Sequence, residues 1–184
     1  TSLSSLRYWY SGCIYDTIPQ MTTFLIAAIT ADGFIARNSS HLASWTSKED
    51  KQFFIEKTKK AGVVVMGLNT FKTMGKALPG RQNIVYAPPG TALEGVEITQ
   101  DDPKTLLSKL EQKGFTEAAI CGGATIYTLF MEAGVIDKLY LSIEPVLFGG
   151  GIHLFNKELD VKLQLQSTQK LSDQTVLLEY NVIK

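Results

Sequence analysis

Asp50 is the acidic residue whose setting best suits proton chemistry. Along a helix, steps of three and four residues lead from Asp50 to Phe53 and Phe54, so the carboxylate shares one face with two aromatic rings that require burial. Loss of hydration on such a face raises the pKa of a carboxyl group and lets it hold or pass a proton near neutral pH. We expect Asp50 to be the only acid inside the site. The alternative, which the pattern alone favours, is a solvated residue that stabilises the positive N-terminus of its helix.

The helix that carries Asp50 is expected to begin at about Ser47. Thr46 is followed three residues later by Glu49, which fits a capping box, in which the hydroxyl and the carboxylate each accept a hydrogen bond from a backbone N–H group. These N–H groups have no partner within the helix itself. Capping here would hold Asp50 in the first helical turn.

Glycine marks two junctions between an apolar run and a helix. One run ends at Cys121 and continues into Gly122 and Gly123, and the run Val63–Met66 continues into Gly67. Glycine lets a ligand approach the backbone, while a helix N-terminus offers unpaired N–H groups and the positive end of a dipole. Because ligands of open α/β sheets lie beyond the carboxyl ends of the strands, the two junctions together predict a site for one dinucleotide. Each junction alone is explained equally well by ordinary turn chemistry.

A turn places Arg81 at the rim of the predicted sheet. Pro79 presets φ and Gly80 accepts a positive φ, and a strand follows directly after the arginine. A guanidinium in this position can bind a carboxylate or a phosphate through two parallel hydrogen bonds, although most such arginines are solvated. His41 and His153 lie far apart without Cys or acidic partners at ligand spacing, so the sequence predicts no metal site.

The composition predicts one globular domain in a reducing compartment. A chain of 184 residues with 45% hydrophobic residues is able to bury a core. Its 18 basic and 18 acidic residues cancel, which argues against nucleic acid and membrane surfaces as partners and favours a small-molecule substrate. Cys13 and Cys121 lie far apart, so a cytoplasmic location is expected rather than a disulfide scaffold.

Residues 1–20 differ in character from the rest of the chain. They combine aromatic and small polar residues without a clear period, and we interpret them as an N-terminal extension for which no order is predicted. Residues 21–184 form the predicted catalytic domain. The sequence reaches nowhere the roughly 20 consecutive apolar residues that a membrane helix requires.

From Met21 onward, the pattern predicts an α/β fold. Short apolar runs rich in β-branched residues alternate with amphipathic stretches, which is typical of a mostly parallel sheet flanked by helices. Polar and apolar residues alternate on both sides of Ser172-Asp173 and predict a C-terminal antiparallel hairpin, so the sheet is mixed. Gly149–Gly151 is expected to bend the chain after a long strand. The expected strands are Phe24–Thr30, Val63–Met66, Asn83–Tyr86, Val96–Thr99, Ala118–Cys121, Lys138–Leu147, Lys162–Leu171 and Thr175–Ile183, and the expected helices are Lys48–Lys60, Asn69–Met74, Pro103–Lys113 and Thr125–Ala133.

Taken together, these residues resemble the dihydrofolate reductase family in order and spacing. The resemblance spans Met21 to the last hairpin and implies that family's single-domain fold. It also implies reduction of 7,8-dihydrofolate to tetrahydrofolate with NADPH as the hydride donor, in a monomer or a homodimer. The segments that carry it are Phe24–Ala36, Trp45 five residues before Asp50, Met66-Gly67, Thr70-Phe71, Leu78–Asn83 and Gly122–Tyr127.

The resemblance also implies roles for individual residues. Asp50 is similar to the acid that binds the amino and ring-nitrogen edge of the pterin, and Ser142 to its hydroxyl partner. Phe54 resembles the aromatic residue that sandwiches the substrate, and Arg81 the arginine that binds the glutamate carboxylate. The other implied site residues are Trp45 beside the catalytic acid, Ala28 and Ile35 in the pterin and nicotinamide pockets, and Gly67, Asn69, Thr70, Gly122, Gly123 and Tyr127 at NADPH. Residues 37–44 are expected to form a mobile loop over the site.

Two other functions stay open. Three segments are more similar to the reductase domain of riboflavin biosynthesis, which reduces a ribosylated pyrimidine phosphate: Thr30–Ala36, Trp45–Ser47 and Glu144–Gly151. Leu68-Asn69 also stands where the dihydrofolate reductase family commonly has a basic residue at the extra phosphate of its cofactor. A nucleotide-binding protein without catalysis is the third possibility, against which an acid such as Asp50 argues.

Overall fold

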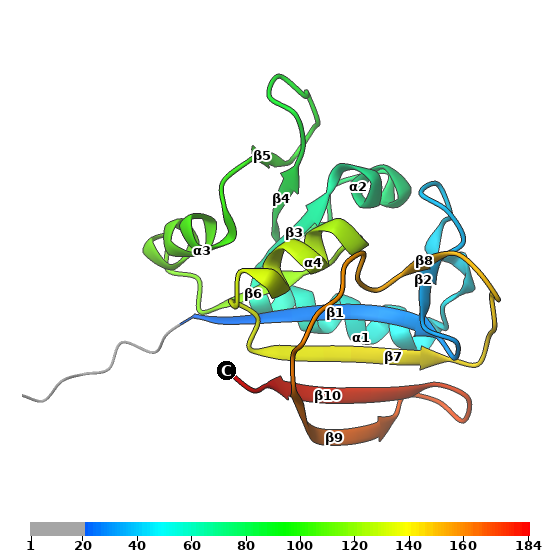
Figure 1. Ribbon diagram of the computed structural model, residues 1–184. Helices are drawn as coiled ribbons and strands as arrows, with labels where there is room; N and C mark the ends of the chain where they lie inside the picture. The colour runs from blue at the N-terminus through cyan, green and yellow to red at the C-terminus, as the bar shows by residue number, and fades with distance from the viewer. Residues whose placement is uncertain (1–20) are drawn as a thin grey trace, which may run out of the picture.

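The computed structural model describes residues 21–184 and contains a mixed, mostly parallel sheet of eight strands (Figure 1). The predicted extension, residues 1–20, lies outside the described residues, as does Cys13. The strands of this sheet are β1 (Thr22–Thr30), β3 (Val63–Gly67), β4 (Gln82–Tyr86), β5 (Glu97–Thr99), β6 (Glu117–Ile120), β7 (Lys138–Glu144), β9 (Leu163–Lys170) and β10 (Val176–Val182). They lie in the order β5-β4-β3-β6-β1-β7-β10-β9, with β10 antiparallel to both of its neighbours. The predicted α/β class and C-terminal hairpin are confirmed.

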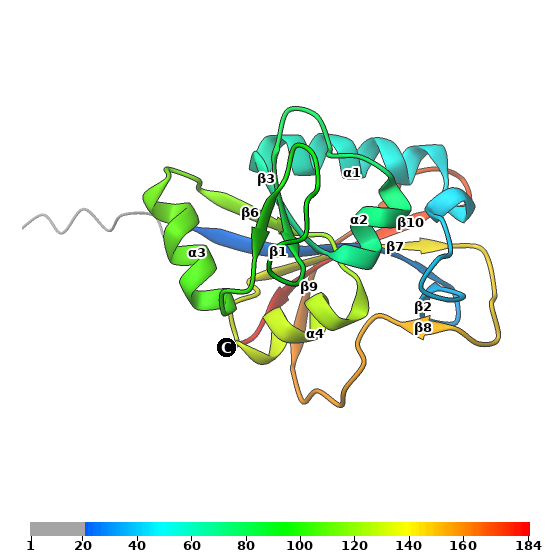
Figure 2. The same cartoon turned by 90° about the horizontal axis from the view of Figure 1, so that it is seen from above.

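Helices cover both faces of the sheet. They are α1 (Lys48–Ala61), α2 (Leu68–Met74), α3 (Pro103–Gln112) and α4 (Ala124–Glu132). Figure 2 shows α1 on one side of the sheet and α3 and α4 on the other. The core is divided accordingly, because successive residues of a strand point to opposite faces. On β1, Phe24 and Ile26 pack on the side of α1, whereas Leu25 packs with α3 and α4. None of the helices within residues 21–184 is long and apolar enough to cross a membrane.

The start of α1 differs from the predicted capping box. Ser47 is the N-cap, and its hydroxyl accepts a hydrogen bond from the N–H of Asp50 at 3.1 Å. The Thr46 hydroxyl instead donates to the carbonyl of Ala43 at 3.3 Å, because Ala43–Trp45 already forms a turn of 3-10 helix. The helix therefore begins one residue later than a Thr46 cap would allow. Asp50 still lies in its first turn.

The strand predicted over Lys138–Leu147 is shorter in the structure, and this error is larger than that at either end of any predicted helix. The expected strand reached Leu147, but pairing ends at Glu144, since the N–H of Val146 folds back to the Glu144 carbonyl at 2.8 Å. The chain then bends through the glycines into β8 (Ile152–His153), which pairs with β2 (Phe34–Ala36) in a small second sheet that the sequence did not predict. A Cβ atom at Gly151 would collide with the Ala36 carbonyl oxygen, which confirms a structural role for this glycine.

Asp32 joins the turn after β1 to the segment after β7. Its carboxylate accepts the N–H groups of Phe148 at 3.1 Å and Gly149 at 2.7 Å, and the Thr30 hydroxyl at 2.5 Å. The Thr30 hydrogen bond is the largest influence on the pKa of Asp32, and with the two backbone donors it lowers that pKa from 3.8 to about 2 against a smaller opposing effect of burial. One carboxylate thus fixes two loops on the same edge of the sheet.

We expect Asp32→Asn to destabilise the protein at neutral pH, with a difference that vanishes in acid. The folded pKa lies below the unfolded value, so the ionised carboxylate stabilises the fold fully above pH 3.8, and this contribution is lost as the pH falls through about 2. Melting temperatures of the parent and the variant, measured from neutral pH downward, should converge. A constant difference at every pH would mean that the amide disturbs the turn by shape rather than by charge.

Candidate active site

A cleft of about 1250 Å³ opens along the carboxyl ends of the parallel strands. Its walls come from the ends of β1, β3, β4, β5 and β6, from α1, α2 and α4, and from the loop that precedes α1. The volume exceeds the about 300–1,000 Å³ of a usual single-ligand pocket. The cleft therefore has room for two ligands side by side.

Asp50 is buried at one end of this cleft. Its residue surface is 8% exposed, and it lines the cleft together with Ala28, Ile35 and Phe54. Burial raises the pKa of the Asp50 carboxyl, the hydroxyl of Ser142 opposes this by hydrogen bonding to it, and the negative charge of Glu144 adds to the rise. Asp50 is therefore not the solvated residue of the alternative interpretation. A carboxyl group with a raised pKa is better suited to exchange a proton with a ligand than a solvated carboxyl group is.

Glu144 is a second buried carboxylate near Asp50, and the sequence reasoning missed it. It is 2% exposed and accepts hydrogen bonds from the N–H of Ser47 at 2.9 Å, the Ser47 hydroxyl at 2.8 Å and the Thr175 hydroxyl at 3.1 Å. It thereby connects the N-cap of α1 to β7 and to the C-terminal hairpin. A signal existed, because Glu144 follows Ser142 by two residues and so points to the same face of β7.

The two glycine junctions meet in the middle of the cleft. The N–H of Gly67 donates to the carbonyl of Gly122 at 2.7 Å. Gly67 and Gly123 line the cleft, and a Cβ atom at Gly123 would lie 3.3 Å from the Thr70 hydroxyl oxygen. The ring of Tyr127 fills the space behind Gly122, where a Cβ atom would lie only 2.9 Å from it. The absence of side chains thus leaves an open cradle between the two junctions.

This cradle fits a phosphate-bearing ligand. At its N-cap, Gly123, α4 has no side-chain cap among the described residues, so no side chain competes with an anion for the N–H groups of Ala124 and Thr125. The helix α2 has only seven residues, and its contribution is the Thr70 hydroxyl rather than the dipole of a long helix. The prediction of one dinucleotide across both junctions is compatible with this geometry.

The loop before α1 packs around Phe148, another residue that the sequence reasoning did not single out. The Arg37 guanidinium lies 4.1 Å from the centre of the Phe148 ring, and the rings of Trp45 and His41 lie 5.1 Å and 5.4 Å from it. Asn38 of this loop lines the cleft, as do His41 and Trp45. Phe148 thus holds one wall of the cleft. The expected mobility of this loop stays a prediction.

Most of the predicted site residues line the cleft, and three do not. Ser142 stands behind Asp50 as its hydrogen-bonding partner, and Gly122 is covered by the Tyr127 ring. Arg81 is bonded to the Thr58 hydroxyl at 2.6 Å and the Pro79 carbonyl at 3.2 Å. The predicted residues that line the cleft are Ala28, Ile35, Trp45, Asp50, Phe54, Gly67, Asn69, Thr70, Gly123 and Tyr127.

The expectation that Asp50 is the only acid in the site is wrong. Asp101 and Asp102 line the opposite end of the cleft, beyond β5. Neither residue was singled out from the sequence, because nothing in a single sequence tells which loop follows which strand into a site. Within residues 21–184, no group of three or more His, Cys, Asp and Glu residues is placed to hold a metal ion.

Comparison with known proteins assigns the family. The family model described as dihydrofolate reductase matches residues 22–144. The chain belongs to the dihydrofolate reductase family. Its members are oxidoreductases, and the match covers the cleft from β1 to the end of β7.

Individual relatives come from two branches of this fold. Dihydrofolate reductase type 3 of Salmonella typhimurium is 33% identical over 136 residues, which are 72% of this chain and 78% of the relative. The solved dihydrofolate reductase of Enterococcus faecalis, complexed with NADP(H) and RAB-propyl, has a TM-score of 0.73 and 23% identity, with 90% of this chain and 98% of that chain covered. A crystal structure from Shewanella sp. PV-4, described as that of a putative riboflavin biosynthesis protein, has a TM-score of 0.76 and 21% identity, with 89% of this chain and 100% of that chain covered. The last two likenesses show a shared fold.

We expect Glu144→Gln to lower the stability of the protein and also the pKa of Asp50. Three donors face the Glu144 carboxylate, and the amide nitrogen must oppose at least one of them, at a cost of about 1–3 kcal/mol, or about 2–12 °C in melting temperature. Removal of the Glu144 charge lowers the pKa of Asp50. In a plot of catalytic rate against pH, the decline on the acidic side should therefore move to lower pH. The control is Thr175→Val, which removes one hydrogen bond and keeps the charge. If both variants shifted the profile equally, Glu144 would act on Asp50 through packing alone.

Proposed function

We propose that this protein reduces 7,8-dihydrofolate to tetrahydrofolate with a hydride from a nicotinamide dinucleotide. The observation that carries the proposal is the position of Asp50, a carboxyl group with a raised pKa buried at the apolar end of a cleft that has room for two ligands. A flat ring between Phe54 and the end of β1 would present its amino and N–H edge to this carboxylate. A non-catalytic nucleotide-binding protein has no need of such a group.

The side chains around Asp50 have separate tasks in this proposal. Asp50 accepts hydrogen bonds from the ring edge and stabilises the cation that forms when the ring is protonated through water. Ser142 fixes the carboxylate from behind. Ala28 and Ile35 exclude water from the face where the ring and the nicotinamide meet. Trp45 closes the same end of the cleft, supported by Phe148.

The dinucleotide would lie across the glycine cradle. Its pyrophosphate is held by the start of α4 at Gly123 and by the Thr70 hydroxyl, beside Gly67. When bound, the nicotinamide supplies the hydride, and the protein contributes position and electrostatics. The resemblance of the sequence predicts NADPH as the dinucleotide. Asn69 and Tyr127, both in the cleft wall, were predicted to contact it as well.

A riboflavin-pathway reductase that acts on a ribosylated pyrimidine phosphate is the second candidate. One structural observation favours it: Asp32 and the Phe148-Gly149 segment, which carry the sequence likeness to that branch, are hydrogen-bonded to each other, and Phe148 packs against Trp45 of the cleft lining. Loss of reduced cofactor absorbance with dihydrofolate, and separately with the ribosylated pyrimidine phosphate, decides between the two. Absence of turnover with both substrates would refute the enzyme assignment.

We expect Asp50→Asn to lower turnover at pH 7 by about a hundredfold or more, because the amide cannot carry the negative charge. The loss should shrink as the pH falls and more substrate arrives protonated. The pKa of Asp50 is higher in the folded protein than in the unfolded chain, so its ionisation destabilises the fold once the pH exceeds the pKa of an unfolded Asp. The variant cannot ionise at this position and should therefore melt at or above the parent's temperature near neutral pH.

The matched control is Glu49→Gln, which removes one charge from the same helical turn at an exposed position outside the cleft. Its turnover should equal that of the parent. Full activity of the Asp50 variant at pH 7 would reduce Asp50 to a structural residue.

Arg81→Leu should separate the two candidate substrates. Under the folate assignment, Arg81 binds a carboxylate remote from the reacting ring, so its loss raises KM with little change in kcat. One charged hydrogen-bonded contact of about 1.5–3 kcal/mol corresponds to about ten- to a hundredfold in KM. A pterin without the glutamate tail is the control and should respond equally to parent and variant. Equal weakening of both substrates would show that Arg81 supports the local turn and the Thr58 contact instead.

A further inference from the structure

The order of the strands places three functional regions along the cleft. Asp50 lies over β1 and β7, the glycine cradle lies at the ends of β3 and β6, and Tyr86 to Pro88 and Thr99 to Asp102 follow β4 and β5. Four strand spacings of about 4.8 Å, or about 19 Å in all, separate β1 from β5. A dinucleotide with its nicotinamide beside Asp50 and its pyrophosphate in the cradle therefore extends its adenosine over β4 and β5.

This adenosine end is acidic. Asp101 and Asp102 line it, together with the uncharged polar residues Asn69, Thr99 and Gln100. Among the described residues that line the cleft, Lys51 is the one lysine or arginine, and its ammonium donates to the carbonyl of Thr46 at 2.8 Å, at the Asp50 end. Among the described residues that line the cleft, no lysine or arginine therefore lies near the expected position of the adenosine ribose.

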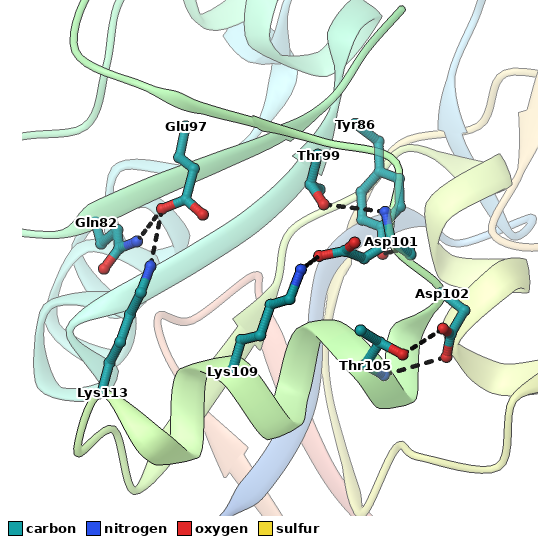
Figure 3. A network of polar contacts seen from close by, with 9 residues as sticks. All are labelled: Gln82, Tyr86, Glu97, Thr99, Asp101, Asp102, Thr105, Lys109 and Lys113. Atoms are coloured by element: carbon teal, nitrogen blue, oxygen red, sulfur yellow. Dashed lines mark hydrogen bonds and ion pairs between the residues drawn. The ribbon is translucent and has the colours of Figure 1, made fainter. Parts of the chain in front are cut away.

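The two carboxylates are held in place by their neighbours (Figure 3). Asp102 accepts hydrogen bonds from the N–H and the hydroxyl of Thr105, at 3.1 Å and 2.5 Å, which lower its pKa and keep it ionised. Asp101 pairs with Lys109 at 2.6 Å, and its carbonyl accepts the Tyr86 hydroxyl at 2.8 Å. Lys109 is not among the residues that line the cleft, and its ammonium offsets part of the negative charge of Asp101, whereas Asp102 has no cationic partner among the ion pairs of the described residues.

NADPH and NADH differ by one phosphate on the 2′-oxygen of the adenosine ribose. A phosphate monoester carries about −1.5 to −2 charges at pH 7 and needs cationic or N–H donors to replace its hydration. Carboxylates at the same place repel it, whereas a carboxylate or an amide accepts a hydrogen bond from a free ribose hydroxyl, as an acidic residue does in NAD-binding sheets.

We propose that the adenosine end of this cleft selects NADH over NADPH, with Asp101 and Asp102 as the residues that determine the preference. The proposal rests on the proposed function, because it assumes that a nicotinamide dinucleotide binds in the cleft. It replaces the NADPH predicted from sequence resemblance. The extra phosphate would face two carboxylates, and the polar groups of Asn69 and Gln100 remain for the ribose hydroxyls.

The direct test is equilibrium binding of NADH and NADPH to the full chain, followed by calorimetry or by quenching of protein fluorescence. We expect NADH to bind about tenfold more tightly at low ionic strength, with a ratio that falls as added salt screens the carboxylates. Equal or tighter binding of NADPH would overturn the proposal and leave the proposed function intact. If neither dinucleotide bound, the proposed function would fall with it.

Two variants sharpen this test. Asp101→Asn removes a carboxylate from the cleft and releases Lys109, so binding of NADPH should strengthen by about threefold or more while NADH changes little. Glu97→Gln is the matched control, because Glu97 belongs to the neighbouring pair with Lys113 at 3.1 Å but lies outside the cleft lining. It should leave the ratio of the two affinities unchanged. An equal shift in both variants would overturn the assignment to Asp101.

A third variant adds the missing cation. Asn69 is exposed at the lip of the cleft, so Asn69→Arg places a guanidinium there without disturbing the core. Binding of NADPH should then strengthen about tenfold or more, since one charged hydrogen bond to the phosphate is gained. Thermal melting of each variant without ligand serves as the check that it is folded. If the Asn69 variant is folded but binds NADPH no more tightly than the parent does, the adenosine lies elsewhere and the proposal is overturned.

Discussion

The cleft depends on the backbone hydrogen bond between the N–H of Gly67 and the carbonyl oxygen of Gly122. This bond continues the parallel pairing of β3 and β6 beyond the last paired residues, where the Cys121 N–H already reaches the Val65 carbonyl at 2.8 Å. Buried N–H and carbonyl groups must be paired, and the Gly67 N–H and the Gly122 carbonyl satisfy each other. The proposed dinucleotide requires open space at the same place. Both demands are met at once because neither residue has a side chain. Every other part of the cleft is placed relative to this contact.

Tyr127 connects the Gly67–Gly122 contact to the central strand of the sheet. Its ring covers Gly122, and its hydroxyl donates to the Ile26 carbonyl at 2.7 Å, so α4 is fixed to β1 as well as to β6. At the other end, β7 carries both Ser142 and Glu144, which hold Asp50 and the N-cap of its helix. The cradle and the acid are thus connected through β1 and β7. A change in either strand would reach both ends of the cleft.

Much of this arrangement is visible in the sequence because it is local. The helices were predicted to within one residue at each end, since caps and glycine stops such as Gly62 act over a few residues. The glycine junctions were located for the same reason. Asp50 was predicted in its helix from the spacing of Phe53 and Phe54, even though the capping residue was assigned one position too early.

The residues that sequence reasoning missed all depend on contacts between distant segments. Glu144 is defined by Ser47 and Thr175, and Phe148 by the loop before α1. Asp101 lines the cleft only because β5 is placed at the edge of the sheet next to β4, which no local pattern specifies. Strand order decides which loops share a site, and a single sequence contains little information about strand order.

The central position of β1 has a consequence for how the chain folds. This first strand pairs with β6 and β7, and the Thr23 N–H reaches the carboxylate of Asp137, 114 residues further along the chain. At a synthesis rate of about 5–20 residues per second, about 6–23 s pass between the emergence of the two partners. Until β6 has been synthesised, both edges of the apolar β1 are unpaired, and pairing over such long sequence separations makes folding slow. An unpaired apolar strand edge is a site for pairing with other chains, so β1 is the strand at which a partly synthesised chain is most exposed to aggregation.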